Sequence, residues 1–90
     1  MFDDVKIRVV KLVTGEEIIA EIEKDEDDVL YCKTPFAVGV NEQRNLVFVP
    51  YMQYTNAAEE IHLQKSHIVI LAEPIESIRN DYLEATRKIL

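Results

Sequence analysis

The apolar residues of this chain change their spacing once, at Pro74, and this change constrains the fold more than any other feature. Before Pro74 they occur in short runs, several of which alternate with polar residues as in half-buried strands. After it they recur at intervals of three and four residues, the spacing of one face of an amphipathic helix. That face consists of Ile75, Ile78, Tyr82, Ala85 and Ile89. The sequence therefore predicts a β-rich domain that ends in one helix over about 75–89.

Turn signals divide the residues before Pro74 into about five short strands. In residues 5–13 apolar residues alternate with polar ones, except at the two consecutive apolar residues Val9-Val10, where we expect a β-bulge. Gly15 is free to adopt the positive φ of a tight turn, and Thr34-Pro35 bends or interrupts a later strand. Short strands with turns at intervals of about ten residues are typical of a small antiparallel barrel. We predict a single domain, residues 1–90, with the barrel over about 5–72.

The formal net charge of −7 is concentrated in one segment. Residues 16–28 hold eight acids and one base, so the other residues together are neutral. A nucleic-acid binder that is basic overall is thereby excluded, whereas a local basic patch is not. Lys6 and Arg8 on the first predicted strand are candidates for such a patch.

Several protein classes do not fit this sequence. Cys32 is the only cysteine, so a disulfide-stapled secreted scaffold is excluded. The first residues are acidic where a signal peptide is basic, and no apolar run approaches the roughly 20 residues of a membrane span. We expect a soluble protein of the cytoplasm with no membrane partner.

No catalytic or metal-binding pattern is present. Ser66 and His67 are neighbours on a predicted strand, where adjacent side chains face opposite ways and cannot form a nucleophile–base pair. His62 and His67 lack the spacing of metal ligands, and Cys32 is far away in sequence. With two glycines in the chain, a phosphate-binding loop is excluded. The sequence predicts neither enzymatic activity nor a metal or other cofactor.

Three segments resemble the Sm-like family, which includes the LSm proteins and bacterial Hfq. Leu12-Val13-Thr14-Gly15 resembles the Leu-x-x-Gly opening of the family's first motif, and Ile18, Ala20 and Ile22 occupy its later apolar and small positions. The segments FVPYMQY (48–54) and KSHIVILAEP (65–74) are similar to those of short Sm-like proteins of marine cyanophages. The likeness covers most of the chain.

This resemblance implies a strongly bent five-stranded barrel of the SH3 type that assembles into a ring of five to seven identical subunits. In the family, the fourth strand of one subunit pairs with the fifth strand of its neighbour. The run Ile68–Leu71, which is apolar on both faces, would be the fifth strand, and residues around Phe48 or Ile61–Leu63 would lie in the fourth. The candidate interface residues are Ile61, Leu63, Ile68, Val69, Ile70 and Leu71.

The resemblance also implies single-stranded RNA as a partner. Basic side chains would contact phosphates, and exposed aromatic rings would stack on bases. The candidates are Lys6, Arg8, Tyr51, Tyr54, His62, Lys65, Ser66 and His67. The family's RNA-gripping Asn falls on Leu30 and its Arg-Gly pair falls near Lys65-Ser66, so its usual pocket is not intact. Two hypotheses follow: an RNA-binding ring, and a protein-interaction ring with no nucleic-acid role.

Overall fold

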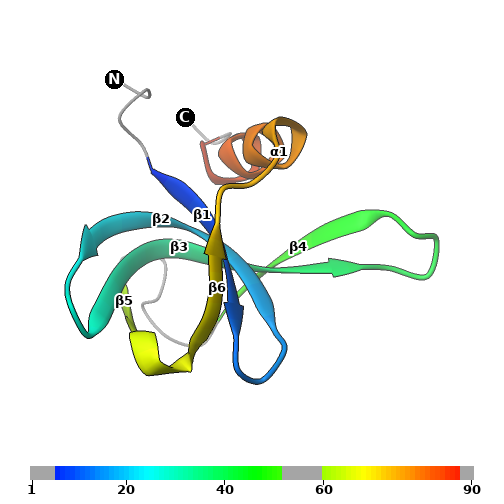
Figure 1. Cartoon of the computed structure of the whole chain (residues 1–90). Coiled ribbons are helices and arrows are strands. Elements are labelled where there is room, and N and C mark those ends of the chain that lie inside the picture. Colours follow the sequence, from blue (N-terminus) through cyan, green and yellow to red (C-terminus); the bar gives the residue numbers. More distant parts are fainter. Residues whose placement is uncertain (1–5, 52–59, 88–90) are drawn as a thin grey trace.

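The computed structural model describes residues 6–51 and 60–87, which form six strands, one 3-10 turn and one α-helix. The elements in chain order are β1 (Ile7–Leu12), β2 (Glu17–Asp25), β3 (Val29–Val40), β4 (Leu46–Pro50), β5 (Ile61–Gln64), the 3-10 turn η2 (Lys65–His67), β6 (Ile68–Ala72) and α1 (Glu76–Arg87). The predicted class, mainly β with a carboxy-terminal helix, is confirmed (Figure 1). Val5 and Ile89, at the ends of the predicted barrel and helix, lie outside the described residues.

All strands belong to one antiparallel sheet in the order β4-β3-β2-β1-β6, with β5 paired to the first part of β3. The last part of β3 and β4 project from the body as a hairpin, which we call the arm (residues 36–50; Figure 1). The sheet is not closed, because β4 and β6 each pair with one strand in the described part of the chain. The sequence predicted about five strands in a barrel; β4 and β5 are instead separate strands that pair with opposite ends of β3.

Strand β3 changes the face that it buries at Thr34-Pro35. These two residues lie opposite the single residue Ala20, because the pairing shifts from Ile19↔Phe36 to Glu21↔Lys33. Thr34 also has a positive φ of 54°. The extra residue is a β-bulge, which bends a strand and reverses the alternation of its side chains. The predicted bend at this position is therefore confirmed.

The bulge separates two hydrophobic clusters on opposite faces of the curved sheet. The inner cluster lies on the concave side and consists of Val10, Leu12, Ile18, Ala20, Leu30 and Cys32. The helix-side cluster consists of Ile7, Ile19 and Tyr82, with Val9, Phe36, Val38, Phe48, Ile78 and Leu83 packed against it. A thin domain buries apolar side chains on both faces of its central strands in this way.

Strand β1 shows why the predicted bulge at Val9-Val10 is wrong. The pairing of β1 with β2 is regular through both residues. Ile7 and Val9 face the helix, whereas Val10 and Leu12 face the inner cluster, so strict alternation buries both sets. The irregularity lies at Lys11/Leu12, in the pairing with β6. The predicted tight turn is confirmed, since Gly15 has a φ of 96° and donates its backbone N–H to the Leu12 carbonyl at 2.9 Å.

Helix α1 is anchored to the sheet by Tyr82, with Ile78 and Leu83 packed in the same cluster. Tyr82 is fully buried, and its ring meets Phe36 edge-on at a centroid distance of 6.0 Å. Its hydroxyl donates a hydrogen bond of 2.6 Å to the carbonyl of Thr34, within the bulge. Ile78 is half-buried beside it, whereas Ile75 is 69% exposed. Of the described residues of the predicted apolar face, Ile78 and Tyr82 therefore pack on the sheet, whereas Ile75 and Ala85 are exposed.

Candidate functional site

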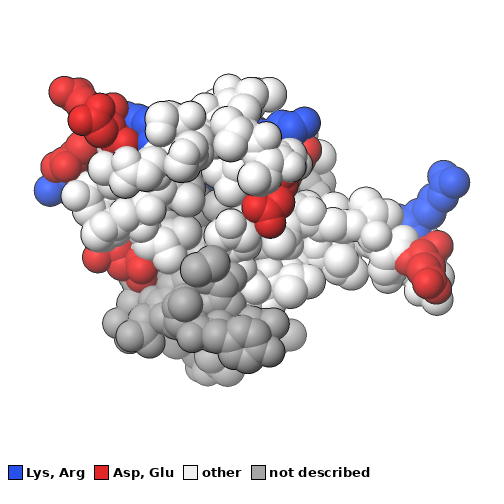
Figure 2. Space-filling view, turned by 90° about the horizontal axis from the view of Figure 1, so that it is seen from below, with Lys and Arg blue, Asp and Glu red and all other residues white. Residues whose placement is uncertain are grey.

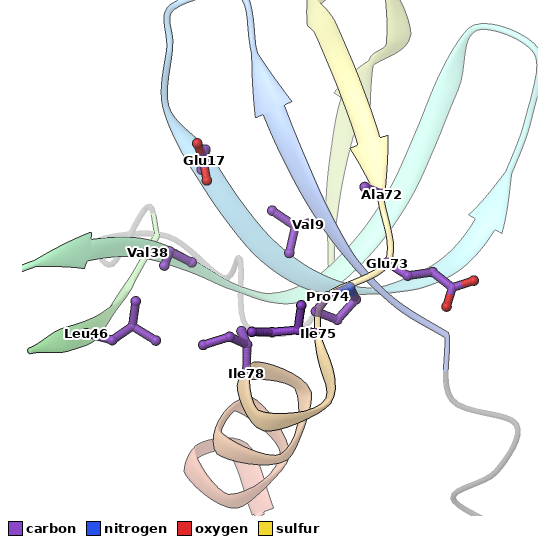
Figure 3. A pocket seen from close by; sticks show the side chains of 9 residues that line it. All are labelled: Val9, Glu17, Val38, Leu46, Ala72, Glu73, Pro74, Ile75 and Ile78. Atoms are coloured by element: carbon purple, nitrogen blue, oxygen red, sulfur yellow. The ribbon is translucent and has the colours of Figure 1, made fainter.

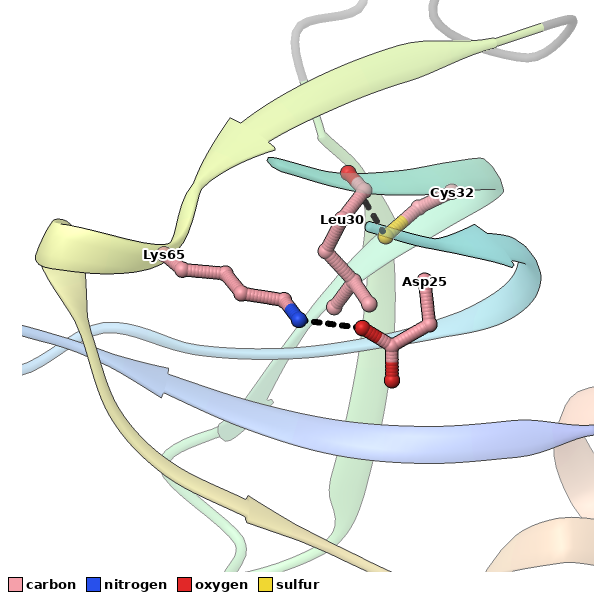
Figure 4. A network of polar contacts seen from close by, with 4 residues as sticks. All are labelled: Asp25, Leu30, Cys32 and Lys65. Carbon is pink, nitrogen blue, oxygen red and sulfur yellow. Dashed lines mark hydrogen bonds and ion pairs between the residues drawn. The ribbon is translucent and has the colours of Figure 1, made fainter. Parts of the chain in front are cut away.

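Lys65 is held by the acidic segment of the chain. Its ammonium pairs with the Asp25 carboxylate at the end of β2 (Figure 4). Its backbone N–H donates to the Asp28 carbonyl at 2.9 Å. Both side chains are partly exposed, so the pair contributes little to stability. The pairing does, however, neutralise a cation that the sequence assigned to phosphate contact. Ser66 and His67 follow in η2 and are exposed.

His62 forms part of an exposed aromatic platform on β3 and β5. It lies directly across from Tyr31 in the strand pairing, with ring centroids 4.4 Å apart and ring planes tilted by 58°. The Lys24 ammonium lies 5.5 Å from the centre of the Tyr31 ring. Carboxylates contact both basic side chains of the platform. Glu60 lies 3.6 Å from His62 Nε2, and Glu26 lies 3.0 Å from Lys24 Nζ. The Glu26 carboxylate, through its hydrogen bond and charge, raises the pKa of Lys24.

The remaining RNA candidates lie elsewhere. Lys6 and Arg8 are at the opposite end of β1 from η2, where Arg8 NH2 lies 3.9 Å from the Glu73 carboxylate. Tyr51 lies against the inner cluster near the β1–β2 turn, and its hydroxyl is 3.5 Å from Glu16 Oε1. Burial, and then the Glu16 charge, raise the Tyr51 pKa. Tyr54 lies outside the described residues.

The predicted RNA-binding residues therefore fall into three separate places. His62, Lys65, Ser66 and His67 share the β5–η2 segment, Tyr51 lies by the β1–β2 turn, and the β1 cations lie at the far end of the sheet. The sequence analysis missed Tyr31 and Lys24, which belong to the aromatic platform. A Tyr three residues after an acidic run gives no sign of its neighbour, because the contact depends on the pairing of β3 with β5.

The candidate interface residues divide into a packed set and an exposed set. Ile61, Leu63 and Ile68 lie partly buried against the chain's own inner cluster. In contrast, Val69, Ile70 and Leu71 on β6 are 59%, 51% and 43% exposed. They lie on an edge strand whose outer side has no partner among the described residues. An exposed apolar edge strand is a template for pairing with another chain.

The arm carries the second exposed apolar surface, which sequence analysis did not single out. Val40, Leu46 and Val49 are 65%, 41% and 48% exposed. The charged residues of the arm are Glu42 and Arg44, which both lie near its tip. Figure 2 accordingly shows the projection white except at its end. The polar run Asn41–Asn45 between two apolar segments predicts a turn between two strands. It does not predict that the resulting hairpin projects from the body of the domain.

An apolar cavity of about 300 Å³ lies between the sheet and the start of α1. Val9, Val38 and Leu46 line it from the sheet, while Ile75 and Ile78 line it from the helix side (Figure 3). Glu17 and Glu73 supply its charged side chains. Such a lining offers no convergent set of polar groups for chemistry.

Reactive groups are few in the described ranges. Cys32 is fully buried, and burial raises the pKa of its thiol from 9.0 to about 11, so the thiol stays protonated at neutral pH. Its Sγ lies 3.9 Å from the Leu30 carbonyl oxygen (Figure 4). Residues 6–51 and 60–87 contain no group of three or more His, Cys, Asp or Glu side chains placed to hold a metal ion. In the same ranges, no helix has the length and apolar character needed to cross a membrane.

No protein-family model matches this chain, and no curated protein matches it. The resemblance to the Sm-like family therefore depends on the residues quoted for it.

Proposed function

We propose that this protein is a non-catalytic, Sm-like subunit that assembles with copies of itself by pairing β6 of one copy with β4 of the next. The observation that carries this proposal is the exposed apolar edge formed by Val69, Ile70 and Leu71. Strand β4 is the other open edge of the same sheet and carries Leu46 and Val49 exposed. Pairing would cover both edges at once.

The amount of apolar surface supports assembly of several subunits over a simple dimer. Fully burying one aliphatic side chain contributes about 1.5–3 kcal/mol, so covering the three half-exposed residues of β6 contributes roughly 3 kcal/mol. The three residues of the arm contribute a similar amount, again roughly 3 kcal/mol. Their sum is below the about 8 kcal/mol of a micromolar complex, even before the entropy cost of association.

The two edges differ, so each junction is head-to-tail. Such junctions generate a closed ring when the rotation per subunit allows it, and an open filament otherwise. In a closed ring the last junction is intramolecular, which compensates for weak individual junctions. A ring of five to seven subunits is what the Sm-like resemblance implies.

Single-stranded RNA is the first ligand to test on this assembly. The aromatic platform of Tyr31 and His62 is half-buried to exposed, and Lys24 lies over the Tyr31 ring. Repeated around a ring, such platforms would stack successive bases. The neighbouring Asp25, Glu26 and Glu60 carboxylates weaken phosphate binding there, so we expect modest affinity that falls with salt.

The second candidate is a ring that binds another protein and no nucleic acid. The observation in its favour is that acids neutralise Lys24 at the platform and Lys65 in the adjacent turn η2. Binding of U-rich and A-rich RNA at moderate salt distinguishes the two candidates. No binding to either RNA, together with a protein partner that survives RNase treatment in a pull-down, would support the second.

Assembly itself is tested by native mass measurement of the full chain and of a Val69→Glu variant. We expect a discrete oligomer for the unmodified chain and monomers for the variant, because a charge on β6 opposes its pairing. Val13→Glu is the matched control, since Val13 is 58% exposed, about as much as Val69. Val13 follows β1 and donates its backbone N–H to the His67 carbonyl, so it lies on the side of β6 that is already paired within the chain. An unchanged oligomer in Val69→Glu would refute the interface.

A further inference from the structure

The tip of the arm presents one cation, Arg44, together with one acid, Glu42. The Asn41 side-chain oxygen accepts hydrogen bonds of 2.9 Å from the backbone N–H groups of Gln43 and Asn45. The backbone of Arg44 has a positive φ of 66° and donates to the Asn41 carbonyl at 3.0 Å. The tip is therefore a defined turn, and within the described residues the Arg44 guanidinium is part of no ion pair.

The β6–α1 connection has the complementary character. The Glu73 side chain is 80% exposed, and its contact with Arg8 is at the long distance of 3.9 Å. Two residues later Ile75 is 69% exposed, the highest exposure among the large apolar side chains of the described residues. An acid beside an uncovered isoleucine thus lies at the end of the open edge strand β6.

The lengths of the two edge strands connect these features. β4 and β6 each have five residues, so antiparallel pairing over their full length puts Leu46 opposite Ala72 and Pro50 opposite Ile68. The arm tip, which precedes Leu46, then lies beside Glu73. Parallel pairing would instead bring the tip to the start of β6, away from Glu73.

The faces of the two strands agree in this antiparallel register. Phe48 packs against the helix-side cluster, so Leu46, two residues before it, lies on the same face. Ala72 pairs with Val9, which also packs against that cluster. Leu46 of one copy would consequently lie on the helix side of the next copy, at the level of Ile75.

We propose that, in the assembly, the arm tip of one copy lies on the β6–α1 connection of the next, where Arg44 pairs with Glu73 and Leu46 covers Ile75. This contact rests on the edge pairing of the proposed function and adds its register and its charge pairing. It makes the junction directional, because only the antiparallel register places Arg44 beside Glu73.

Charge reversal at the two positions tests the contact. The full chain and the variants Arg44→Glu, Glu73→Arg and the double exchange are followed by analytical ultracentrifugation over a concentration series. Because an exposed ion pair is worth little and reversal converts attraction into repulsion, we expect each single variant to raise the midpoint concentration of assembly by about three- to tenfold. The double exchange should return the midpoint to that of the unmodified chain.

A further variant controls for net charge. Glu84→Arg changes the charge as Glu73→Arg does, at an exposed position on α1, and should leave the midpoint within about twofold. Circular dichroism checks that every variant is folded. An Ile75→Gln variant, with a side chain that is exposed in the single chain, should weaken assembly without changing the spectrum.

The outcomes separate the contact from the edge pairing beneath it. If the chain assembles and Val69→Glu disrupts it, but the charge variants do not shift the midpoint, the tip contact is wrong and the edge pairing stands. A double exchange that fails to restore assembly also overturns the Arg44–Glu73 pairing. Stronger assembly of Arg44→Glu would refute the pairing with Glu73 and with it the proposed register. A chain that stays monomeric at all concentrations refutes both proposals.

Discussion

Replacing Tyr82 with Phe should measurably weaken the attachment of helix α1 to the sheet. The change removes the hydroxyl that donates 2.6 Å to the Thr34 carbonyl and leaves the buried ring and its edge-on contact with Phe36 in place. A net contribution of about 0.5–1.5 kcal/mol is typical of one hydrogen bond, and this one is partly buried. We therefore expect Tyr82→Phe to lower the free energy of unfolding by about 1 kcal/mol.

The assay is urea unfolding followed by circular dichroism, at one fixed protein concentration because assembly itself adds to stability. For a domain of this size, a loss of 1 kcal/mol corresponds to a fall in melting temperature of roughly 4–8 °C. Tyr31→Phe is the matched control, since the Tyr31 hydroxyl has no hydrogen bond in the described residues, and it should change stability by less than about 0.5 kcal/mol. Equal stabilities of the Tyr82→Phe and unmodified chains would refute the role of the hydroxyl.

Three further predictions concern other parts of the chain. Gly15→Ala should cost about 1 kcal/mol in urea unfolding, because a φ of 96° strains any L side chain although no atom lies within 4 Å of the added methyl; no loss would show that the turn relaxes. Stability should fall between about pH 9 and 11, because the unfolded state releases the Cys32 proton near 9.0 while the folded state keeps it to about 11. The slope should shrink in a Cys32→Ala variant, and an equal slope in both would contradict this account. Asp25→Asn should change stability by less than about 1 kcal/mol yet tighten RNA binding by freeing Lys65; weaker or unchanged binding in a filter assay would count against an RNA role for Lys65.

The prediction of the elements succeeded where local pattern and burial agree. The change of period at Pro74 placed the helix, and Gly15 placed the first turn. It failed for β1, where Val9-Val10 looked like a slip because one-sided burial was assumed. The strand is buried on both faces. Val10 and Leu12 face the inner cluster, and the opposite face, with Ile7 and Val9, packs in the helix-side cluster with Tyr82 of α1.

The candidate site was predictable only in part, for a physical reason. The role of β6 as an interface strand came from the Sm-like resemblance, whereas its position at the edge of the sheet is seen only in the structure. The arm was missed, because its exposure depends on where β3 leaves the body after the bulge. The aromatic platform depends likewise on the pairing of Tyr31 with His62, two residues 31 positions apart in the chain.

The sequence by itself determined the β-rich class, the terminal helix, the concentration of charge in residues 16–28 and the apolar character of β6. All of these follow from periodicity and composition, which act over a few neighbouring residues. Only the tertiary structure decided which cations are neutralised and which apolar residues stay uncovered. Lys65 meets Asp25 across 40 positions, and Arg44 is left outside any ion pair at the end of the arm, because strand register and curvature set these distances.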